Sequence, residues 1–130
     1  MYSHIFKPLE VGGLKLRNRL TMAPMYLGYA GEGGSVSELL LEHYRLMAQS
    51  GVAMVVVENA TIDLQRGSGA RRSIRADTDD NLDGLKRLAE TIKQEGALAC
   101  LQITMQDAML PSRKWLLLLP WKLSDVCPRL

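Results

Sequence analysis

The sequence of 130 residues has few of the patterns that mark specialised classes of protein. Its two cysteines, Cys100 and Cys127, form neither a CxxC motif nor a disulfide framework. The longest apolar run, from Trp115 to Trp121, is far shorter than the roughly 20 residues of a membrane helix. No basic segment followed by an apolar stretch opens the chain, so no secretory signal is predicted. We therefore expect reduced cysteines and a cytoplasmic location, with no membrane partner.

An excess of one charge is also missing, since 16 basic residues are interspersed with 14 acidic ones. Nucleic acids and anionic membranes attract basic clusters, so neither is an expected partner of a chain with net charge +2. The hydrophobic content of 47% is ordinary for a soluble protein. The length allows one small domain with a core of its own.

The first part of the chain predicts a hairpin, a strand and a helix. Residues 11–16 have two adjacent glycines at their centre, which is typical of a tight hairpin turn. Residues 19–24 predict a short buried strand that ends at a proline. A glycine-rich loop follows over residues 28–34. An S-x-x-E capping box then begins at Ser35, and a helical pattern runs from it through residue 50.

The second part repeats the alternation of strand and helix. Residues 52–57 are a continuous apolar run of strand length, typical of a strand buried on both faces. A polar, arginine-rich loop is expected over residues 61–78. Leucines and an isoleucine at helical spacing predict a helix over residues 80–94, and residues 98–103 predict a third buried strand.

The order strand, helix, strand, helix, strand implies right-handed parallel βαβ units in an α/β fold. Two architectures fit this order: a doubly wound sheet or a (β/α)8 barrel. A complete barrel needs roughly 250 residues, so three strands would form only part of one.

Several short pieces match a known family in both order and spacing. From residue 5 to residue 103 they read Ile5-Phe-Lys-Pro-Leu9, Leu16-Arg-Asn-Arg-Leu20, Met22-Ala-Pro-Met25, His43-Tyr44, Ala48 to Gly51, Val55-Val-Val-Glu-Asn-Ala60, Gln65-Arg-Gly67 and Gly96 to Gln102. Through these pieces the chain resembles the Old Yellow Enzyme family, the NADH:flavin oxidoreductases, including the 2,4-dienoyl-CoA reductase-like branch. The resemblance implies that residues 1–103 form the amino-terminal part, about three βα units, of an incomplete FMN-binding (β/α)8 TIM barrel.

The resemblance also implies where the cofactor lies, because such barrels place their chemistry at the carboxyl ends of the strands. The residues expected to contact the flavin of FMN are Ala23, Pro24, Met25, Tyr26, Ala60 and Gln102. Tyr29 is expected on the substrate side. Many relatives carry cysteine or threonine at the position of Tyr26, so the tyrosine is a departure from the family pattern.

The implied activity is that of a flavoprotein ene-reductase. NADH or NADPH would reduce FMN, and an alkene conjugated to a carbonyl would then be reduced. In the family the groups that hold and protonate the substrate lie downstream of residue 103, so no catalytic residue and no metal are expected here. We expect little stable FMN binding and no turnover from these 130 residues alone. A non-enzymatic fragment stays open as an alternative.

Residue types alone favour simpler roles for several side chains. Met22 and Met25 would pack in a core, His43 would pack within its helix, and Cys100 would be an inert buried thiol. The arginines of the loop over residues 61–78 would be solvated. The glycines of residues 31–34 lack the phosphate-loop pattern, but a small α/β module that binds a phosphate ligand there is a second alternative.

The resemblance stops abruptly after Gln102, where the family continues with an apolar residue, a variable one and then His-Ala-Gly-Arg. One base lost near codon 103 or 104 would account for this. Each original codon would then combine the last base of one codon with the first two of the next, and residues 105–108 can restore His-Ala-Gly-Arg. We therefore expect residues 104–130 to be a frameshifted tail without a native fold. A genuine divergent tail is the alternative.

Overall fold

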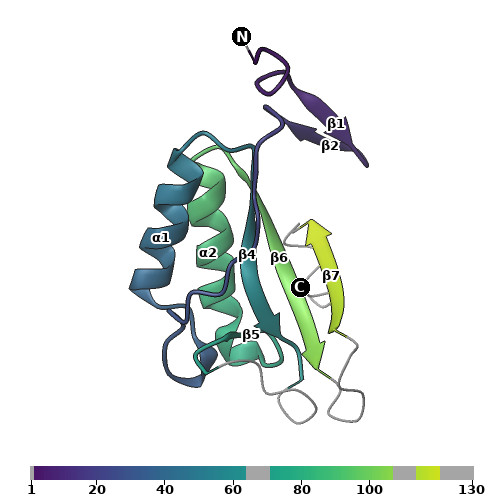
Figure 1. The fold of residues 1–130 in the computed structure, drawn as a ribbon. Coiled ribbons are helices and arrows are strands. Elements are labelled where there is room, and N and C mark those ends of the chain that lie inside the picture. The colour runs from purple at the N-terminus through teal and green to yellow at the C-terminus, as the bar shows by residue number, and fades with distance from the viewer. Residues whose placement is uncertain (1, 64–70, 107–113, 121–130) are drawn as a thin grey trace.

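The computed structural model describes residues 2–63, 71–106 and 114–120. These residues form a sheet with two helices on one face, together with a separate two-stranded hairpin (Figure 1). The strands are β1 (Leu9–Val11), β2 (Leu14–Leu16), β3 (Thr21–Met22), β4 (Met54–Thr61), β5 (Ile74–Arg75), β6 (Leu98–Gln106) and β7 (Lys114–Pro120). The helices are α1 (Glu38–Gln49) and α2 (Leu82–Gln94), each preceded by a 3-10 turn, η1 (Glu32–Gly34) and η2 (Asp79–Asn81).

The strand order distinguishes between the two architectures that the sequence allows. The order is β3-β4-β6-β7, and β3, β4 and β6 run parallel to one another. Helix α1 connects β3 to its neighbour β4, helix α2 connects β4 to its neighbour β6, and both helices cover the same face (Figure 1). A doubly wound sheet instead reverses its order and carries helices on both faces. The described residues are therefore the amino-terminal part of an unclosed (β/α)8 barrel, as predicted.

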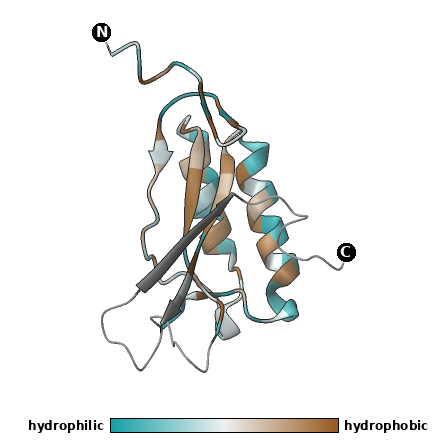
Figure 2. Ribbon diagram, turned by 90° about the vertical axis from the view of Figure 1, so that its right-hand side faces the viewer, coloured by the Kyte–Doolittle hydropathy of each residue, from teal (hydrophilic) through white to brown (hydrophobic). Residues whose placement is uncertain are grey.

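The core lies between this sheet and the two helices. Val55 and Val57 on β4 alternate with residues of the other face, as Ala99 and Leu101 do on β6, and all four face the helices. The helices contribute the apolar positions whose spacing predicts them: Leu40, Leu41, Tyr44, Ala48, Leu85, Leu88, Ala89 and Ile92. Figure 2 shows the apolar colouring of the central strands against the mixed colouring of the helices. The predicted strands and helices are thus confirmed where their apolar residues are buried.

The amino-terminal hairpin is also confirmed. Leu9 pairs with Leu16 in antiparallel register, and the turn between the strands is formed by Gly12 and Gly13. Both glycines have positive φ, 54° and 80°, as a two-residue hairpin turn requires. The hairpin lies beyond the amino-terminal ends of β4 and β6, at the end of the sheet opposite to the site described below (Figure 1).

Helix α1 begins two residues later than the capping box predicts. Its N-cap is Ser37, whose hydroxyl oxygen accepts a hydrogen bond from the amide of Leu40 at 3.1 Å. Ser35 instead donates its hydroxyl to the carbonyl oxygen of Glu32 at 2.9 Å and closes the turn η1. The prediction that Ser35 caps the helix is wrong because η1 already uses this serine.

The first parallel strand is shorter and more exposed than predicted. The side chain of Asn18 turns the chain just before it, accepting from the amide of Leu20 at 2.9 Å and donating to the carbonyl of Gly51 at 2.8 Å. Strand β3 therefore comprises only Thr21, which is exposed, and Met22, which is half-buried. Within the described sheet β3 is an edge strand, so the prediction of a buried strand is wrong at this position.

The last described strands depart from the parallel pattern. Strand β6 continues past residue 103 to Gln106, and its outer edge pairs with β7. This pairing is antiparallel, from Cys100 opposite Pro120 to Gln106 opposite Lys114, whereas the barrel repeat would place a parallel strand at this edge. Trp121 and Cys127 lie outside the described residues.

Candidate functional site

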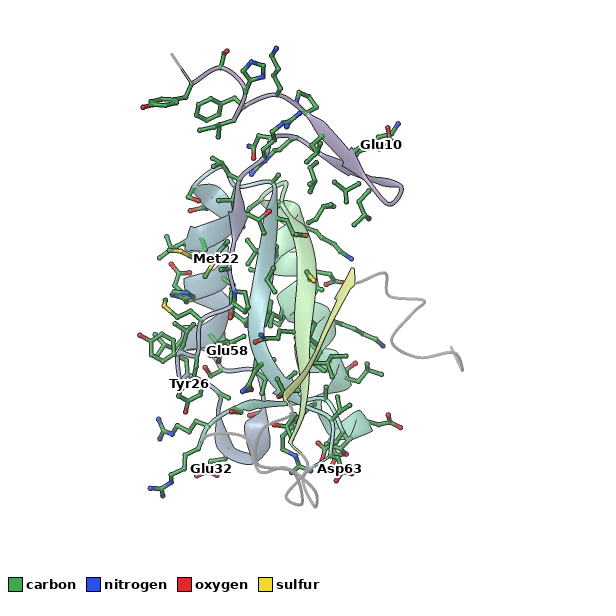
Figure 3. All side chains as sticks on the ribbon, turned by 45° about the vertical axis from the view of Figure 1, so that its right-hand side comes forward. Glu10, Met22, Tyr26, Glu32, Glu58 and Asp63 are labelled. Atoms are coloured by element: carbon green, nitrogen blue, oxygen red, sulfur yellow. The ribbon has the colours of Figure 1, made fainter. Side chains whose placement is uncertain are left out.

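The carboxyl ends of the parallel strands bring the predicted site residues to one end of the sheet. Ala23 to Tyr26 follow β3 directly, and Ala60 lies near the end of β4. Gln102 lies in the middle of β6, level with residues 58 and 59 of β4. Figure 3 shows Met22, Glu58 and Tyr26 following one another toward this end, with Glu32 and Asp63 beyond them. The structure therefore gathers the predicted flavin contacts at the end where a barrel carries its chemistry.

A β-bulge shapes the middle of this site. Val57 pairs with Leu101 and Ala60 pairs with Ile103, so two residues of β4, Glu58 and Asn59, lie opposite the single residue Gln102 of β6. Such a bulge redirects side chains at a strand end. Because of the extra residue, Val57 and Ala60, on either side of the bulge, both belong to the core beneath the helices.

Two polar atoms at the bulge are buried and have no hydrogen-bond partner among the described residues. They are Oε1 of Glu58 and Oδ1 of Asn59. Buried acceptors are normally paired, so an unpaired one calls for a reason. The half-buried Gln102 of β6 lies beside these residues of β4, and strand β7 pairs with the other edge of β6. The carboxamide of Gln102 can both donate and accept hydrogen bonds, as polar atoms at the edge of a cofactor ring require.

The segment after β3 offers an apolar surface beside these polar groups. Met25 is 57% exposed and Tyr26 is 49% exposed, which is high for such large side chains. The hydroxyl of Tyr26 donates to the carbonyl oxygen of Arg71 and so ties the segment to the loop after β4. A flat ring can pack against an exposed pair of side chains of this kind. The exposure of Met25 also argues against the interpretation that it packs in the core.

Ala60 and Tyr29 are less exposed than Met25 and Tyr26. Ala60 is fully buried in the core beneath the helices, so any contact with a cofactor would come from its main chain. Tyr29 is 37% exposed and packs edge-on against His43, with ring centroids 6.0 Å apart. It also lines a cavity of about 530 Å³, together with the glycine-rich loop and Arg72. This volume is within the range of small-molecule sites.

Glu58 is a functional candidate that the sequence pattern does not single out. Its side chain is fully buried, and its Oε2 accepts a hydrogen bond from the backbone amide of Leu27. Burial raises the pKa of the carboxyl group, while the amides of Leu27 and Gly28 oppose the rise. Glu58 stands in the family-matching piece Val55 to Ala60, but the sequence does not indicate its role because its partner lies in a distant segment.

The remaining polar candidates take structural roles. Arg75 forms a two-pronged ion pair with Asp77, at 2.9 and 3.0 Å, rather than standing free in the loop. Burial lowers the pKa of His43, and its buried Nε2 has no hydrogen-bond partner among the described residues. Cys100 is buried, and burial raises the pKa of its thiol. Arg66 lies outside the described residues.

The described part of the chain lacks the features of two other kinds of site. It contains no cluster of three or more histidine, cysteine or acidic side chains that could hold a metal ion. Among the same residues no helix is long and apolar enough to cross a membrane. The site at the carboxyl ends of β3, β4 and β6 is therefore the one that the fold and its polar groups favour.

Neighbouring parallel strands with their helices on one face, and polar groups near the carboxyl ends of the strands, are the arrangement of a barrel enzyme. Residues 4–114 match the model of the NADH:flavin oxidoreductase / NADH oxidase family, and the chain belongs to that family. Members of this family use FMN, with NADH or NADPH as electron donor. The match ends within the tail that follows residue 103.

Individual relatives agree with the family. The chain is 34% identical over 102 residues to an NADH oxidase of Thermoanaerobacter brockii, covering 78% of this chain and 16% of the relative. It is 40% identical over 100 residues to an NADH:fumarate oxidoreductase of Klebsiella pneumoniae, covering 76% of this chain and 11% of that protein. A solved 2-naphthoyl-CoA reductase superimposes with a TM-score of 0.77 at 28% identity, covering 81% of this chain and 16% of that one. The chain thus spans less than a fifth of these relatives.

Proposed function

We propose that this chain supplies one wall of the flavin site of an FMN-dependent oxidoreductase that uses NADH or NADPH. The observation that carries the proposal is the meeting of three strand ends. The exposed segment after β3 adjoins a bulge of β4 whose polar residues lie opposite Gln102 of β6. A barrel flavoprotein binds its ring at this end of the strands.

Each residue of the wall has a binding role rather than a catalytic one. The side chains of Ala23, Pro24, Met25 and Tyr26 line the ring, and Gln102 offers hydrogen bonds to the ring edge. The main chain of Ala60 approaches from β4, and Tyr29 belongs to the substrate side. When bound, FMN supplies hydride transfer from the nicotinamide donor to the acceptor. The groups that bind and protonate the substrate are supplied by sequence beyond residue 103.

The acceptor that we favour is an activated alkene, whose double bond is conjugated to a carbonyl or carboxyl group. Support comes from the relative named NADH:fumarate oxidoreductase, because fumarate is an alkene of this kind. The solved relative named 2-naphthoyl-CoA reductase was found with an aromatic thioester, whose carbonyl is also conjugated. Both share the feature of a carbonyl carbon next to the reducible bond.

Residues 104–130 are, in this proposal, an out-of-frame extension rather than the fourth barrel unit. The antiparallel pairing of β7 supports this, because the next strand of a barrel would pair in parallel with β6. The test is to sequence the source DNA from codon 95 into the downstream region. One restored base that yields His-Ala-Gly-Arg and an open frame would support the extension. If the DNA confirms the present reading frame and encodes no further barrel strands, the out-of-frame extension is ruled out. The family membership would then describe only the origin of the chain.

The activity is tested by comparing the 130-residue chain with the frame-restored protein. We expect the restored protein to purify with a visible flavin absorbance band and to oxidise NADH in the presence of fumarate. The 130-residue chain should retain little flavin and show no turnover. Stoichiometric flavin on the 130-residue chain, with NADH oxidation above background, would contradict the expectation that it is inactive.

A matched pair of variants tests the site itself. In the frame-restored protein, Gln102→Leu should weaken FMN binding about tenfold or more, because one hydrogen bond to the ring is lost. Gln94→Leu, at an exposed position of α2, is the control and should leave the affinity unchanged. Equal affinities of the two variants would remove Gln102 from the proposed site.

A further inference from the structure

Glu58 has an unusual position for a charged residue. Among the residues that the structure describes, it is the only buried one with a carboxyl group, and its exposed fraction is 0%. It lies within the apolar strand β4, where a buried carboxylate is costly unless it is paired. No cation pairs with it in the described residues, so backbone amides must stabilise its charge.

Both the backbone and the side chain of Glu58 are hydrogen-bonded to other parts of the chain. Its backbone amide donates to the hydroxyl oxygen of Tyr44 on α1 at 2.7 Å, which fixes the position of the residue in the strand. Its carboxylate accepts from the amide of Leu27, and the amide of Gly28 also stabilises its charged form. Glu58 therefore connects helix α1 through β4 to the segment that follows β3.

The amides that Glu58 holds come directly after the exposed wall residues. Gly28 has a φ of +70°, and a Cβ at this position would lie 3.2 Å from the hydroxyl oxygen of Tyr26. The chain thus turns sharply at Gly28 and brings Tyr26 close to the turn. Fixing the amides of residues 27 and 28 consequently fixes where Tyr26 and Met25 leave the sheet.

We propose that Glu58 is a positioning residue whose carboxylate, by binding the amides of Leu27 and Gly28, holds Met25 and Tyr26 in place as the wall of the cofactor site. The inference rests on the proposed function, since the wall has a purpose only if a ring lies against it. The amide of Leu27 donates directly to this side chain and the amide of Gly28 favours its charged form, and a carboxylate accepts such hydrogen bonds with the assistance of its charge. A glutamine in its place would offer one acceptor oxygen and a competing NH₂ group.

The first experiment is an NMR titration of the uniformly ¹⁵N-labelled 130-residue chain between pH 4 and pH 8. The amide resonances of Leu27 and Gly28 should shift with one shared inflection that lies above the ordinary glutamate value of 4.5. Tyr44, which bonds the backbone of Glu58, has a pKa raised by burial and so does not titrate in this range. His43 is next to Tyr44 on α1 and its pKa is lowered from 6.5, so the same titration of His43→Gln separates its contribution from that of Glu58. Amides that do not titrate, or that exchange freely with solvent, would overturn the proposal without any variant.

Variants then separate positioning from general support of the fold. Glu58→Ala should speed hydrogen exchange at Leu27 and Gly28 about tenfold or more, since a charge-assisted hydrogen bond is lost. Exchange at Val57 and Leu101 in the sheet should change much less. Glu58→Gln should abolish the pH titration of the two amides and keep part of the protection of Leu27 from hydrogen exchange. This variant replaces Glu58→Ala in the test if the alanine variant does not fold. Glu90→Gln, at an exposed position of α2, is the matched control. A uniform loss of protection across the sheet would mean that Glu58 is merely structural.

The flavin role of the wall is tested apart from the anchor, by titrating FMN into the frame-restored protein with and without Glu58→Gln. Weaker binding in the variant, with intact binding in Glu90→Gln, is expected. Equal binding would overturn the positioning role and leave the proposed function standing. If both amides titrate but no protein binds FMN, the anchor is real and the proposed function is what fails.

Discussion

The hydroxyl oxygen of Tyr44 lies 2.7 Å from the backbone amide of Glu58 and joins helix α1 to strand β4 across the core. Both residues are fully buried. The amide cannot pair within the sheet ladder at the bulge, so the phenol replaces a missing strand partner. Burial also raises the pKa of Tyr44, so the phenol stays neutral and remains available as an acceptor over the physiological range.

Tyr44→Phe should therefore destabilise the fold although it keeps the ring. The amide of Glu58 would be left buried and unpaired, which costs about 1–3 kcal/mol. Urea unfolding followed by circular dichroism at pH 7 measures the change. Tyr2→Phe is the control, because Tyr2 is 84% exposed and its hydroxyl should contribute less than about 0.5 kcal/mol. Equal stability of both variants would show that the Tyr44 hydroxyl does not satisfy this amide.

The start of helix α1 gives a second prediction, since two nearby serines compete for the role of cap. Ser37→Ala removes the acceptor for the amide of Leu40 and should cost about 1 kcal/mol of folding free energy. Ser35→Ala removes only a hydroxyl that closes η1 and should cost clearly less. Thermal unfolding of the two variants compares them directly. A larger loss for Ser35→Ala would restore the capping box predicted from the sequence.

Prediction from sequence succeeds for the buried strands and for helix α2. The strands over residues 52–57 and 98–103 are predictable because their side chains are apolar on both faces, as burial between helices and a barrel interior requires. The helix over residues 82–94 is predictable because Leu85, Leu88 and Ile92 recur on one face. In each case the information lies within the element itself.

Prediction fails where the deciding partner lies far away in the chain. The pattern S-x-x-E is satisfied at Ser35, but the turn η1 decides which serine caps the helix. The burial of Glu58 depends on Leu27, 31 residues earlier, and no local pattern indicates that contact. For the candidate site, the resemblance to a family predicts the residues of the wall. Glu58, which we propose positions Met25 and Tyr26, is identified only from the structure.

The glycine-rich loop yields a third prediction that also addresses the phosphate-binding alternative. Gly34 has a φ of +74°, and a Cβ there would lie 2.5 Å from Cγ of Arg75, whose guanidinium is held by Asp77. Gly33 has a φ of +65° and open space around it. Gly33→Ala should cost about 1–2 kcal/mol from backbone strain alone. Gly34→Ala should cost at least about 1 kcal/mol more, because the new methyl group overpacks the site.

Urea unfolding of both variants measures this difference, and a titration with inorganic phosphate tests the alternative function. If the loop cradles a phosphate, the unmodified chain should bind it and Gly33→Ala should weaken binding while leaving Arg75 undisturbed. We expect no saturable binding of phosphate by the unmodified chain. Equal stabilities of the two glycine variants would show that Arg75 yields easily to a side chain at position 34.

Arg17 provides a fourth prediction at the opposite end of the sheet. Its guanidinium donates to the carbonyl oxygen of Val52 at 2.8 Å and to the last carbonyls of both helices, those of Ala48 and Glu95, at 3.4 Å. A planar fork can serve several carbonyls at once, which an ammonium group cannot. Arg17→Lys should therefore cost about 1 kcal/mol of stability. Arg19→Lys, which is exposed, is the matched control and should change the stability very little.

The pH dependence of stability gives the last prediction, which concerns His43 on α1. Burial lowers its pKa from 6.5, so the unfolded chain binds a proton at a higher pH than the folded chain does. The contribution of His43 to stability is therefore present above pH 6.5 and is lost as the pH falls below that value through the lowered pKa of the folded state. His43→Gln should remove this loss, so the stability of the variant relative to the unmodified chain should rise as the pH is lowered from 7 to 5.

Glu58 titrates in the opposite sense, with stability lost as the pH rises above 4.5, but it is common to both proteins and cancels in their difference. His4→Gln, at an exposed position, is the control, and a difference curve that is flat for His43→Gln would show that the imidazole is hydrated in the folded protein.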